Sequence, residues 1–547
     1  MPDHRQGRGR GPIAGLAVAA LIISACGSST ATPSGSPSVA PSPSPSPVAS
    51  VSPSPGDTTP RGGTMTLPIS ADVGNWDPGN VSASSPGSQA DLLSAVYGSL
   101  VWTDARGVVQ PGIARALTTT DAVNWTLKLR EGVKFIDGHL LDAEAVKYNW
   151  DRLADPANGE PAQKYMAAVV TSVVDPATLS IRLPQADADF ALRCAEQFPY
   201  VASPAALAAA AKKTDIRPIG AGPFELQTWT PGVGAVLARN TVYWDAPRPY
   251  LDGLRFNVVP DALARMGAVA QGSAQFTPGF PYQFGTNATA THVTTLKIDI
   301  PGYNVMYFNT RSGLFSDVRA RQAVWSGVDL GKLVGAQTTD STLAAPSSWY
   351  PSTSPYYDAT LAFPTFDPAK AQGLFDALAA GRSLPIHLVA ANSADASRAA
   401  LYLQHALEGY KGVSVAISLI PLVSWSDTCL GQHAFDICLQ PGILTLNGPE
   451  PSASSLLSST GSQNVSGYSS PAMDADLAAS LSAVTDADRK AAYVKVQQQF
   501  LQDLPLALYG LQDRYLLMRD NTCGVVPGGQ GQVQAQFLYI AWFPGEC

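Results

Sequence analysis

The chain has 547 residues, a formal net charge of −8, 45% hydrophobic residues and only 14% charged residues. This length accommodates about three domains of roughly 150 residues each. An acidic chain without a cluster of Lys and Arg lacks the basic surface of a nucleic-acid-binding protein. The single apolar run that approaches membrane-spanning length lies at the N-terminus, which argues against a multi-span membrane protein.

Residues 1–26 have the features of an export signal. Arg5, Arg8 and Arg10 precede the apolar stretch 13–23, which is shorter than the ~20 residues of a membrane-spanning helix. Small residues then lead to Cys26, an ending that resembles a bacterial lipobox. This resemblance implies a lipid on Cys26 and an extracytoplasmic protein anchored to the outer face of the cell membrane. The alternative is an ordinary signal peptide with an incidental Cys.

Residues 27–60 form a low-complexity segment dominated by Pro and Ser. Such a segment has too little apolar surface to offset the entropy of ordering by burial. Repeated Pro-Ser favours an extended polyproline geometry, so the segment reaches on the order of 100 Å at ~3.1 Å per residue. We expect a disordered stalk that lifts a globular body off a membrane. An O-glycosylated spacer is an alternative that is compatible with a stalk.

Cysteine usage fits an exported protein. Apart from Cys26, five cysteines remain, so one of them has no intramolecular partner. We expect disulfides between the pairs closest in sequence, Cys429 with Cys438 and Cys523 with Cys547. Cys194 is then expected to be a free, buried thiol. The absence of CxxC and of zinc-like Cys/His spacing predicts no metal site.

Strand and helix patterns alternate from about residue 62 to the end. Apolar and polar residues alternate over 124–130, which predicts a half-buried strand, and short β-type runs recur at 386–390 and 413–420. Helical periodicity follows several residues that are suited to cap a helix N-terminus. These are Asp142, Asp317, Asp367, and Thr485 or Asp486. The alternation predicts α/β or α+β layering.

Motifs for catalysis are missing from the sequence. There is no HExxH, GxSxG or GxxxxGK[ST], and no two of the six His are three or four residues apart. We therefore expect a protein that is not an enzyme and carries no cofactor. A carboxylate pair for sugar chemistry stays open, because spacing alone does not test it.

Five separated segments occur in an order typical of one protein family. The first reads WTLKLREGVKFIDGHLLDAEAVKYNWDRLADP. The segments occupy residues 125–156, 219–261, 303–329, 435–459 and 467–480. Together they resemble the large extracytoplasmic solute-binding proteins of ABC importers, the peptide/nickel-binding family 5.

Each motif also has a plain structural interpretation. We expect Gly220 and Gly222 to allow unusual backbone angles at the entry to a strand. Asn240 is expected to pack in a core, while Arg319 and Arg321 decorate the surface of a helix. The motifs therefore indicate a fold and do not identify a ligand.

The resemblance implies an α/β, bilobed periplasmic-binding-protein-like fold of type II with an extra small domain. One lobe would combine residues 61–98, 218–300 and 507–547. The extra domain would be 99–217, and the second lobe 301–506. Two crossing strands would act as hinges, near 298–303 and 504–508.

The family implies binding without chemical change. The lobes would close on a small-molecule solute, and the closed monomer would be recognised by the permease of an importer that also contains ATPase subunits. Two alternatives remain open from the sequence. One is a ligand-sensing or adhesive lipoprotein on the same scaffold, and the other is a secreted hydrolase.

The resemblance also places candidate ligand contacts. The chain after Asn75-Trp-Asp-Pro78 would offer backbone groups to the solute. Other contacts would come from the hinge side and from the second lobe, where core packing of Trp425 is an equal alternative. The candidates are Val81, Ser82, Ala83, Ser84, Tyr303, Asn304, Trp425, Thr445 and Asn447.

The fourth segment departs from the pattern of peptide binders. Those proteins carry an Asp that pairs with the free ammonium of the peptide, and Asn447 stands near that position here. An Asn cannot supply a charge-assisted contact worth ~1.5–3 kcal/mol. We therefore expect that peptides with a free ammonium are not preferred, and that a neutral, blocked or amphiphilic molecule is.

Overall fold

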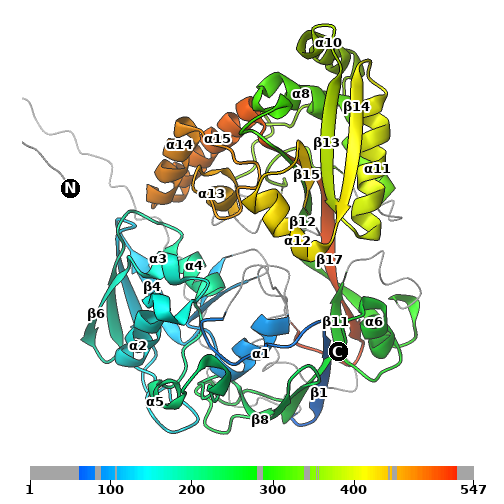
Figure 1. The fold of residues 1–547 in the computed structure, drawn as a ribbon. Helices are drawn as coiled ribbons and strands as arrows, with labels where there is room; N and C mark the ends of the chain where they lie inside the picture. The colour runs from blue at the N-terminus through cyan, green and yellow to red at the C-terminus, as the bar shows by residue number, and fades with distance from the viewer. Residues whose placement is uncertain are drawn as a thin grey trace, which may run out of the picture. The chain divides into compact units, whose positions relative to one another are not determined.

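The structure is a computed structural model of mixed α/β architecture (Figure 1). It describes residues 61–80, 88–104, 108–279, 288–337, 345–352, 354, 356–440, 444–445 and 452–525, all of which belong to one compact unit. The predicted signal, Cys26 and the Pro/Ser-rich stalk lie outside the described residues. None of the helices in the described part combines the length and the apolar character needed to cross a membrane.

The first sheet has four strands in the order β1-β10-β9-β8. Its first strand, β1, is parallel to β10, and the other pairs are antiparallel. Helix α1 (Ser88–Tyr97) buries Leu92, Leu93 and Val96 in the core of this sheet. The strands are β1 (Thr64–Ile69), β8 (Phe224–Thr230), β9 (Gly234–Arg239) and β10 (Gly253–Val258).

A second hydrophobic core is formed by residues that lie between β1 and β8 in the sequence. An antiparallel sheet of order β4-β5-β7-β6 packs with α2 (Ala143–Ala154) and α4 (Phe190–Gln197) around Trp150, Phe190 and Phe198. The strand predicted at 124–130 is confirmed as β5. The strands are β4 (Ala114–Thr119), β5 (Asn124–Leu129), β6 (Val170–Asp175) and β7 (Thr178–Arg182), and the smaller elements are β2 (Val101–Thr103), β3 (Val109–Pro111), α3 (Gln163–Met166) and α5 (Pro204–Ala209).

The largest core surrounds a seven-stranded sheet of order β11-β17-β12-β15-β13-β14, with β16 also paired to β12. Helix α11 packs on β13 and β14 (Figure 1). The strands are β11 (Phe276–Gly279), β12 (Val293–Phe308), β13 (Leu384–Ala391), β14 (Val413–Ile420), β15 (Ile437–Leu439), β16 (Leu444–Thr445) and β17 (Leu506–Arg519). The helices that follow β11 include α8 (Val318–Gly327), α9 (Leu330–Gln337), α10 (Pro368–Ala379), α11 (Ala394–Glu408), α12 (Leu422–Trp425), α13 (Ser452–Leu457), α14 (Pro471–Ser482) and α15 (Asp486–Asp503).

The four helix starts expected from capping residues are confirmed. The side chains of Asp142, Asp317, Asp367 and Thr485 each accept a hydrogen bond from a backbone N–H in the first turn. Each cap satisfies one of the donors that the start of a helix leaves without an intrahelical acceptor. These starts are local features, which is why the sequence predicts them.

The expected role of Gly220 and Gly222 is wrong. Neither has a positive φ, so neither needs the backbone freedom of Gly. Both lie against the backbone of α1 instead. An added Cβ would stand 2.1 Å from the carbonyl O of Val96 at Gly220 and 2.6 Å from that of Ala95 at Gly222. Close approach of two backbones therefore explains this motif.

The expected surface position of Arg321 is also wrong, although Arg319 is exposed and pairs with Asp317 as a helix start permits. Arg321 is buried and donates to the carbonyl O atoms of Phe315 at 2.6 Å and Asp503 at 2.7 Å. It therefore ties the start of α8 to the end of α15. Hydrogen bonds from a side chain to backbone carbonyl groups do not alter the apolar periodicity of a helix, so the sequence pattern does not predict the burial of Arg321.

Asn240 is buried, as expected, and its Nδ2 donates to the carbonyl O of Gly222 at 2.8 Å.

Strands β12 and β17 both continue across the borders predicted near residues 300 and 507. The domain borders themselves stay predictions.

Candidate ligand-binding site

Strand β12 brings several of the predicted ligand contacts together. Tyr303 and Asn304 lie on it, and its Gly302 and Tyr303 face Thr445 and Leu444 of β16 in an antiparallel pair. Three candidates from two distant segments thus lie within one short stretch of sheet. Val81, Ser82, Ala83, Ser84 and Asn447 lie outside the described residues, and Thr445 is described by its backbone alone.

The ladder between β12 and β17 is irregular where the hinges are predicted. Ile298 faces Arg514 and Gly302 faces Gln512, so β12 advances four positions while β17 advances two. A second shift follows, because Asn304 faces Gly510 but Val305 faces Leu508. Extra residues of this kind bend a strand and loosen its pairing locally. The two shifts flank residues 302–304.

The side chains of Tyr303 and Asn304 are both 1% exposed. Burial raises the pKa of the Tyr303 hydroxyl above its ordinary value, so this group stays a neutral donor and acceptor. Asn304 fits only because residue 510 is Gly. An added Cβ at Gly510 would lie 2.4 Å from Asn304 Oδ1.

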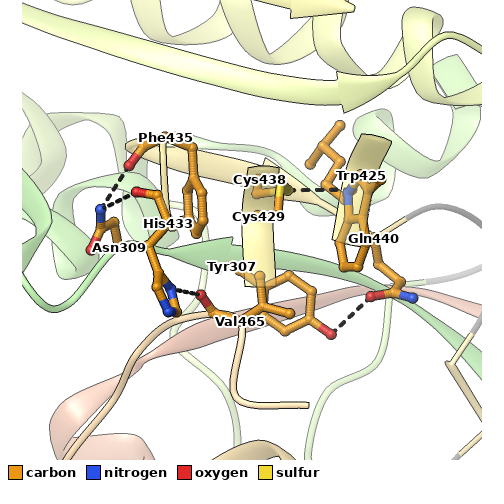
Figure 2. Close-up of a disulfide and its surroundings, with 10 residues drawn as sticks. Tyr307, Asn309, Trp425, Cys429, His433, Phe435, Cys438, Gln440 and Val465 are labelled. Carbon is orange, nitrogen blue, oxygen red and sulfur yellow. Dashed lines mark hydrogen bonds between the residues drawn. A yellow bond between two sulfur atoms is a disulfide. The ribbon is translucent and has the colours of Figure 1, made fainter. Parts of the chain in front are cut away.

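Trp425 packs in the core beside the same sheet. It is 7% exposed, and its Nε1 donates to the carbonyl O of Leu439 on β15 at 2.9 Å (Figure 2). This geometry matches the alternative of core packing, and a ligand contact by Trp425 stays a prediction.

A disulfide fixes the first part of the fourth segment, 435–459. Cys429 and Cys438 are bonded and buried, and Tyr307 on β12 donates to Gln440 Oε1 at 3.0 Å (Figure 2). Asn309 Nδ2 donates to the carbonyl O of Phe435 at 2.9 Å. These bonds position residue 440, just before the predicted contacts Thr445 and Asn447.

The other cysteines are consistent with the expected pairing. Cys194 is free and buried. Cys523 is disulfide-bonded, and its expected partner Cys547 lies outside the described residues.

A buried cluster of charges holds the segment that precedes Val81. Arg152 on α2 binds both carboxylate oxygens of Asp77, at 2.8 and 2.5 Å, and reaches Glu160 Oε1 at 3.1 Å. Lys213 Nζ lies 2.9 Å from the same Glu160 oxygen. The side chains of Asp77 and Glu160 have no exposed area. Burial raises the pKa of Glu160 against the opposing effect of Lys213.

The backbone of this segment is also fixed. The amide N of Gly79 donates to Asp77 Oδ1 at 3.0 Å, and the Tyr97 hydroxyl donates to the carbonyl O of Trp76. Gly79 has no room for a side chain, because an added Cβ would lie 2.5 Å from Leu153 Cδ2. These contacts therefore fix the backbone of residues 75–80, which directly precede the predicted ligand contacts at 81–84.

Asp91 on α1 carries a further buried carboxyl group, and it follows the predicted ligand contacts 81–84 in the sequence. It is 7% exposed, and its Oδ1 has no hydrogen-bond partner. Burial raises the pKa of Asp91 well above its ordinary value of 3.8.

Sequence reasoning missed Arg152, Glu160 and Lys213. Asp77 and Arg152 both lie in quoted segments, but they are 75 positions apart. Both positions have charged neighbours, Asp72 and Asp151 among them, so neither stands out by composition. Nothing in the spacing pairs them with each other.

Two observations concern metal binding and nucleophilic catalysis in the described part of the chain. Among the described residues, no group of three or more His, Cys, Asp or Glu is placed to hold a metal ion. His387 Nε2 lies 2.9 Å from Ser418 Oγ, but Asp436 accepts from the backbone N of His387 at 2.8 Å. This carboxylate therefore does not orient the imidazole as a catalytic triad requires.

Comparison with known proteins gives a family and a fold. A family model described as bacterial extracellular solute-binding proteins, family 5 middle, matches residues 108–464. The glutathione-binding protein GsiB of Escherichia coli K12 is 34% identical over 201 residues, which are 36% of this chain and 39% of that protein. The chain thus aligns with less than half the length of this curated relative.

Solved structures match over more of the chain. The ABC transporter substrate-binding protein CtaP of Listeria monocytogenes has a TM-score of 0.76 and 21% identity, covering 88% of this chain and 99% of its own. DppA of Helicobacter pylori, in complex with the peptide STSA, has a TM-score of 0.74 and 19% identity, covering 88% and 98%. NikA of Brucella suis, in complex with Fe(III)-EDTA, has a TM-score of 0.73 and 21% identity, covering 87% and 99%. These matches confirm the periplasmic-binding-protein-like α/β fold.

We predict that Arg152→Met lowers the free energy of unfolding by about 3–5 kcal/mol, because it leaves two buried carboxylates with Lys213 alone. Lys147→Met on the same helix is the matched control. It removes an exposed pair with Asp151 and is expected to cost about 0.3–0.5 kcal/mol. Urea denaturation of both variants measures the difference, and equal losses would contradict a structural role for the cluster.

Asp91→Asn is predicted to change the pH dependence of stability. The native carboxyl keeps its proton to higher pH than the unfolded one, so this group costs stability as pH rises above about 3.8 toward its native pKa. Each unit of difference between the two pKa values corresponds to about 1.4 kcal/mol. The free energy of unfolding of the variant relative to the parent protein should therefore increase from pH 4 to pH 7. A difference that stays constant over this range would refute the prediction.

Proposed function

Because the chain belongs to the bacterial extracellular solute-binding proteins of family 5, we propose that it is the substrate-binding lipoprotein of an ABC importer. In this proposal the protein captures a small solute between two lobes and delivers it, chemically unchanged, to a permease driven by an ATPase. The lobes close around the solute by bending at β12 and β17.

The family match over residues 108–464 is the observation that carries this proposal. It includes β12, β15 and β16, which bring Tyr303, Asn304 and Thr445 together. The likeness to solved binding proteins over 88% of the chain supports the same function. The paired register shifts beside residues 302–304 support bending at this point.

The proposed solute is a small peptide-like or other amphiphilic molecule. GsiB is named for glutathione, and DppA was solved with a peptide, so both support a peptide-like class. Asn447 in place of the Asp of peptide binders argues against recognition of a free ammonium group. A solute with a neutral or blocked amino end fits both observations.

The proposed anchor is a lipid on Cys26. The Pro/Ser-rich residues 27–60 would then separate the binding body from the membrane surface. This arrangement keeps a diffusing body close to its permease, because a tether raises the effective concentration of one partner near the other.

Calorimetry with a panel of solutes tests the proposed function. The panel contains glutathione, Fe(III)-EDTA, and the peptide Ser-Thr-Ser-Ala in free and N-acetylated forms. We expect at least one peptide-like member to bind, and acetylation to weaken binding less than threefold. Absence of binding across the panel, with no co-purifying molecule in native mass spectrometry, would contradict capture of a solute.

Asn447→Asp is the matched variant for the solute class. An Asp at this position should favour the free over the acetylated peptide by roughly 10- to 150-fold, the equivalent of ~1.5–3 kcal/mol. If the unmodified protein already shows that preference, the argument from Asn447 is wrong.

Cys26→Ser tests the anchor. The parent protein should fractionate with membranes and carry a diacylglyceryl group at residue 26 in an intact-mass measurement. The variant should lose both properties while it keeps solute binding. Membrane fractionation of the variant at the parent level would rule out Cys26 as the anchor.

A further inference from the structure

A buried ion pair joins two regions that are 300 positions apart in the chain. Arg489, in the first turn of α15, donates from Nη1 to Asp189 Oδ1 at 2.7 Å and from Nη2 to the carbonyl O of Ala188 at 3.1 Å. The amide N of Ala188 donates to the carbonyl O of Leu481 at 2.6 Å, and the Tyr493 hydroxyl lies 3.5 Å from Asp189 Oδ2. We call these contacts of residues 188–189 with residues 481, 489 and 493 the seam.

The seam connects the predicted extra domain with the predicted second lobe. Four hydrogen bonds between described residues of 99–217 and of 301–506 gather at Ala188 and Asp189. A connection made at one polar point can be broken without exposing a broad apolar interface.

A pocket beside the ion pair shows that the two regions are not closely packed there. Its volume is about 250 Å³. Leu117, Thr118 and Trp125 line it from one region, and Val484 and Arg489 line it from the other. The ion pair therefore lies at the edge of a pocket that both regions line.

The charges of the seam are buried together. The side chain of Asp189 is 4% exposed, and that of Arg489 is 19% exposed. Burial raises the pKa of the Asp189 carboxyl, and the Arg489 guanidinium opposes this effect. The two opposite charges therefore compensate each other in a largely dehydrated site.

Asp189 is positioned from its own side of the seam. The Asp187 carboxylate accepts from Arg193 Nε at 2.6 Å, from the Tyr165 hydroxyl at 2.7 Å, and from the amide N of Asp189 at 3.0 Å. This network lies within 99–217 and does not depend on Arg489. Asp189 is therefore held ready to pair whenever Arg489 approaches.

We propose that the seam is a latch that favours the closed arrangement of the two regions. This inference rests on the proposed function, in which the lobes separate to admit and to release a solute. Formation of the Asp189–Arg489 pair stabilises the closed state with or without solute, and its rupture accompanies opening. Loss of the pair therefore shifts the population toward open molecules.

Amide hydrogen exchange of the full chain, measured without solute, tests the latch. The amide of Ala188 reports directly on opening, because its acceptor lies across the seam. In Arg489→Gln this amide should exchange at least tenfold faster than in the parent protein. The charge reversal Asp189→Arg with Arg489→Asp should return the rate to within threefold of the parent.

Arg248→Gln is the matched control. It removes an Arg–Asp pair of similar burial, with side chains 19% and 13% exposed, that lies outside both 99–217 and 301–506. The Ala188 amide should then exchange less than threefold faster than in the parent protein. An equal acceleration in both variants would mean that the effect is a general loss of stability, and would overturn the latch.

Small-angle X-ray scattering supplies the second measurement. The radius of gyration of Arg489→Gln should exceed that of the parent and of Arg248→Gln. An unchanged radius with fast Ala188 exchange, or an unchanged Ala188 rate, would overturn the proposal. Neither measurement needs a solute, so failure to find one would count against the proposed function and leave this result standing.

Discussion

The backbone ladder between β12 and β17 is the constraint on which the remaining structure depends. The two strands stay paired from Val293 opposite Arg519 to Tyr307 opposite Leu506. Because a regular ladder resists bending, we expect relative motion of the parts that it connects at the places where the pairing is irregular. The register shifts beside residues 302–304 are such places, and the predicted ligand contacts on β12 lie between them. The proposed binding and the proposed bending thus involve the same few residues.

Charged residues are scarce in this chain, and three arginines of low exposure lie at junctions between elements. Arg152 joins the segment around Asp77 to α2, Arg321 joins α8 to the end of α15, and Arg489 reaches across the seam to Asp189. A buried guanidinium contributes little net stability when its desolvation is counted, but it is strongly unfavourable without its partner. Such groups therefore specify which elements meet, whereas the apolar cores supply most of the driving force for folding.

Local features of this fold can be predicted from sequence, and long-range features cannot. Asp142 and Thr485 identify helix starts because a cap bonds an amide only three residues away. Gly220 and Arg321 show the limit. The requirement for Gly220 comes from the backbone of α1, and the acceptor at Asp503 is 182 positions from Arg321. The candidate site shares this limit, because β12 and β16 are adjacent only in the folded sheet. The family resemblance predicted that these segments contribute to one site, whereas the periodicity of the sequence did not.

The burial of the Cys429–Cys438 disulfide limits when this bond can form. Both sulfur atoms are fully buried, so reductants reach them poorly once the surrounding core has formed. The oxidation must therefore take place while this stretch is still accessible, in a compartment that permits it. A copy that matured in a reducing cytoplasm would complete the same core around two thiols. The oxidation state of Cys438 on β15 would then be preserved in the core, directly beside β12, the strand on which the candidate binding site is built.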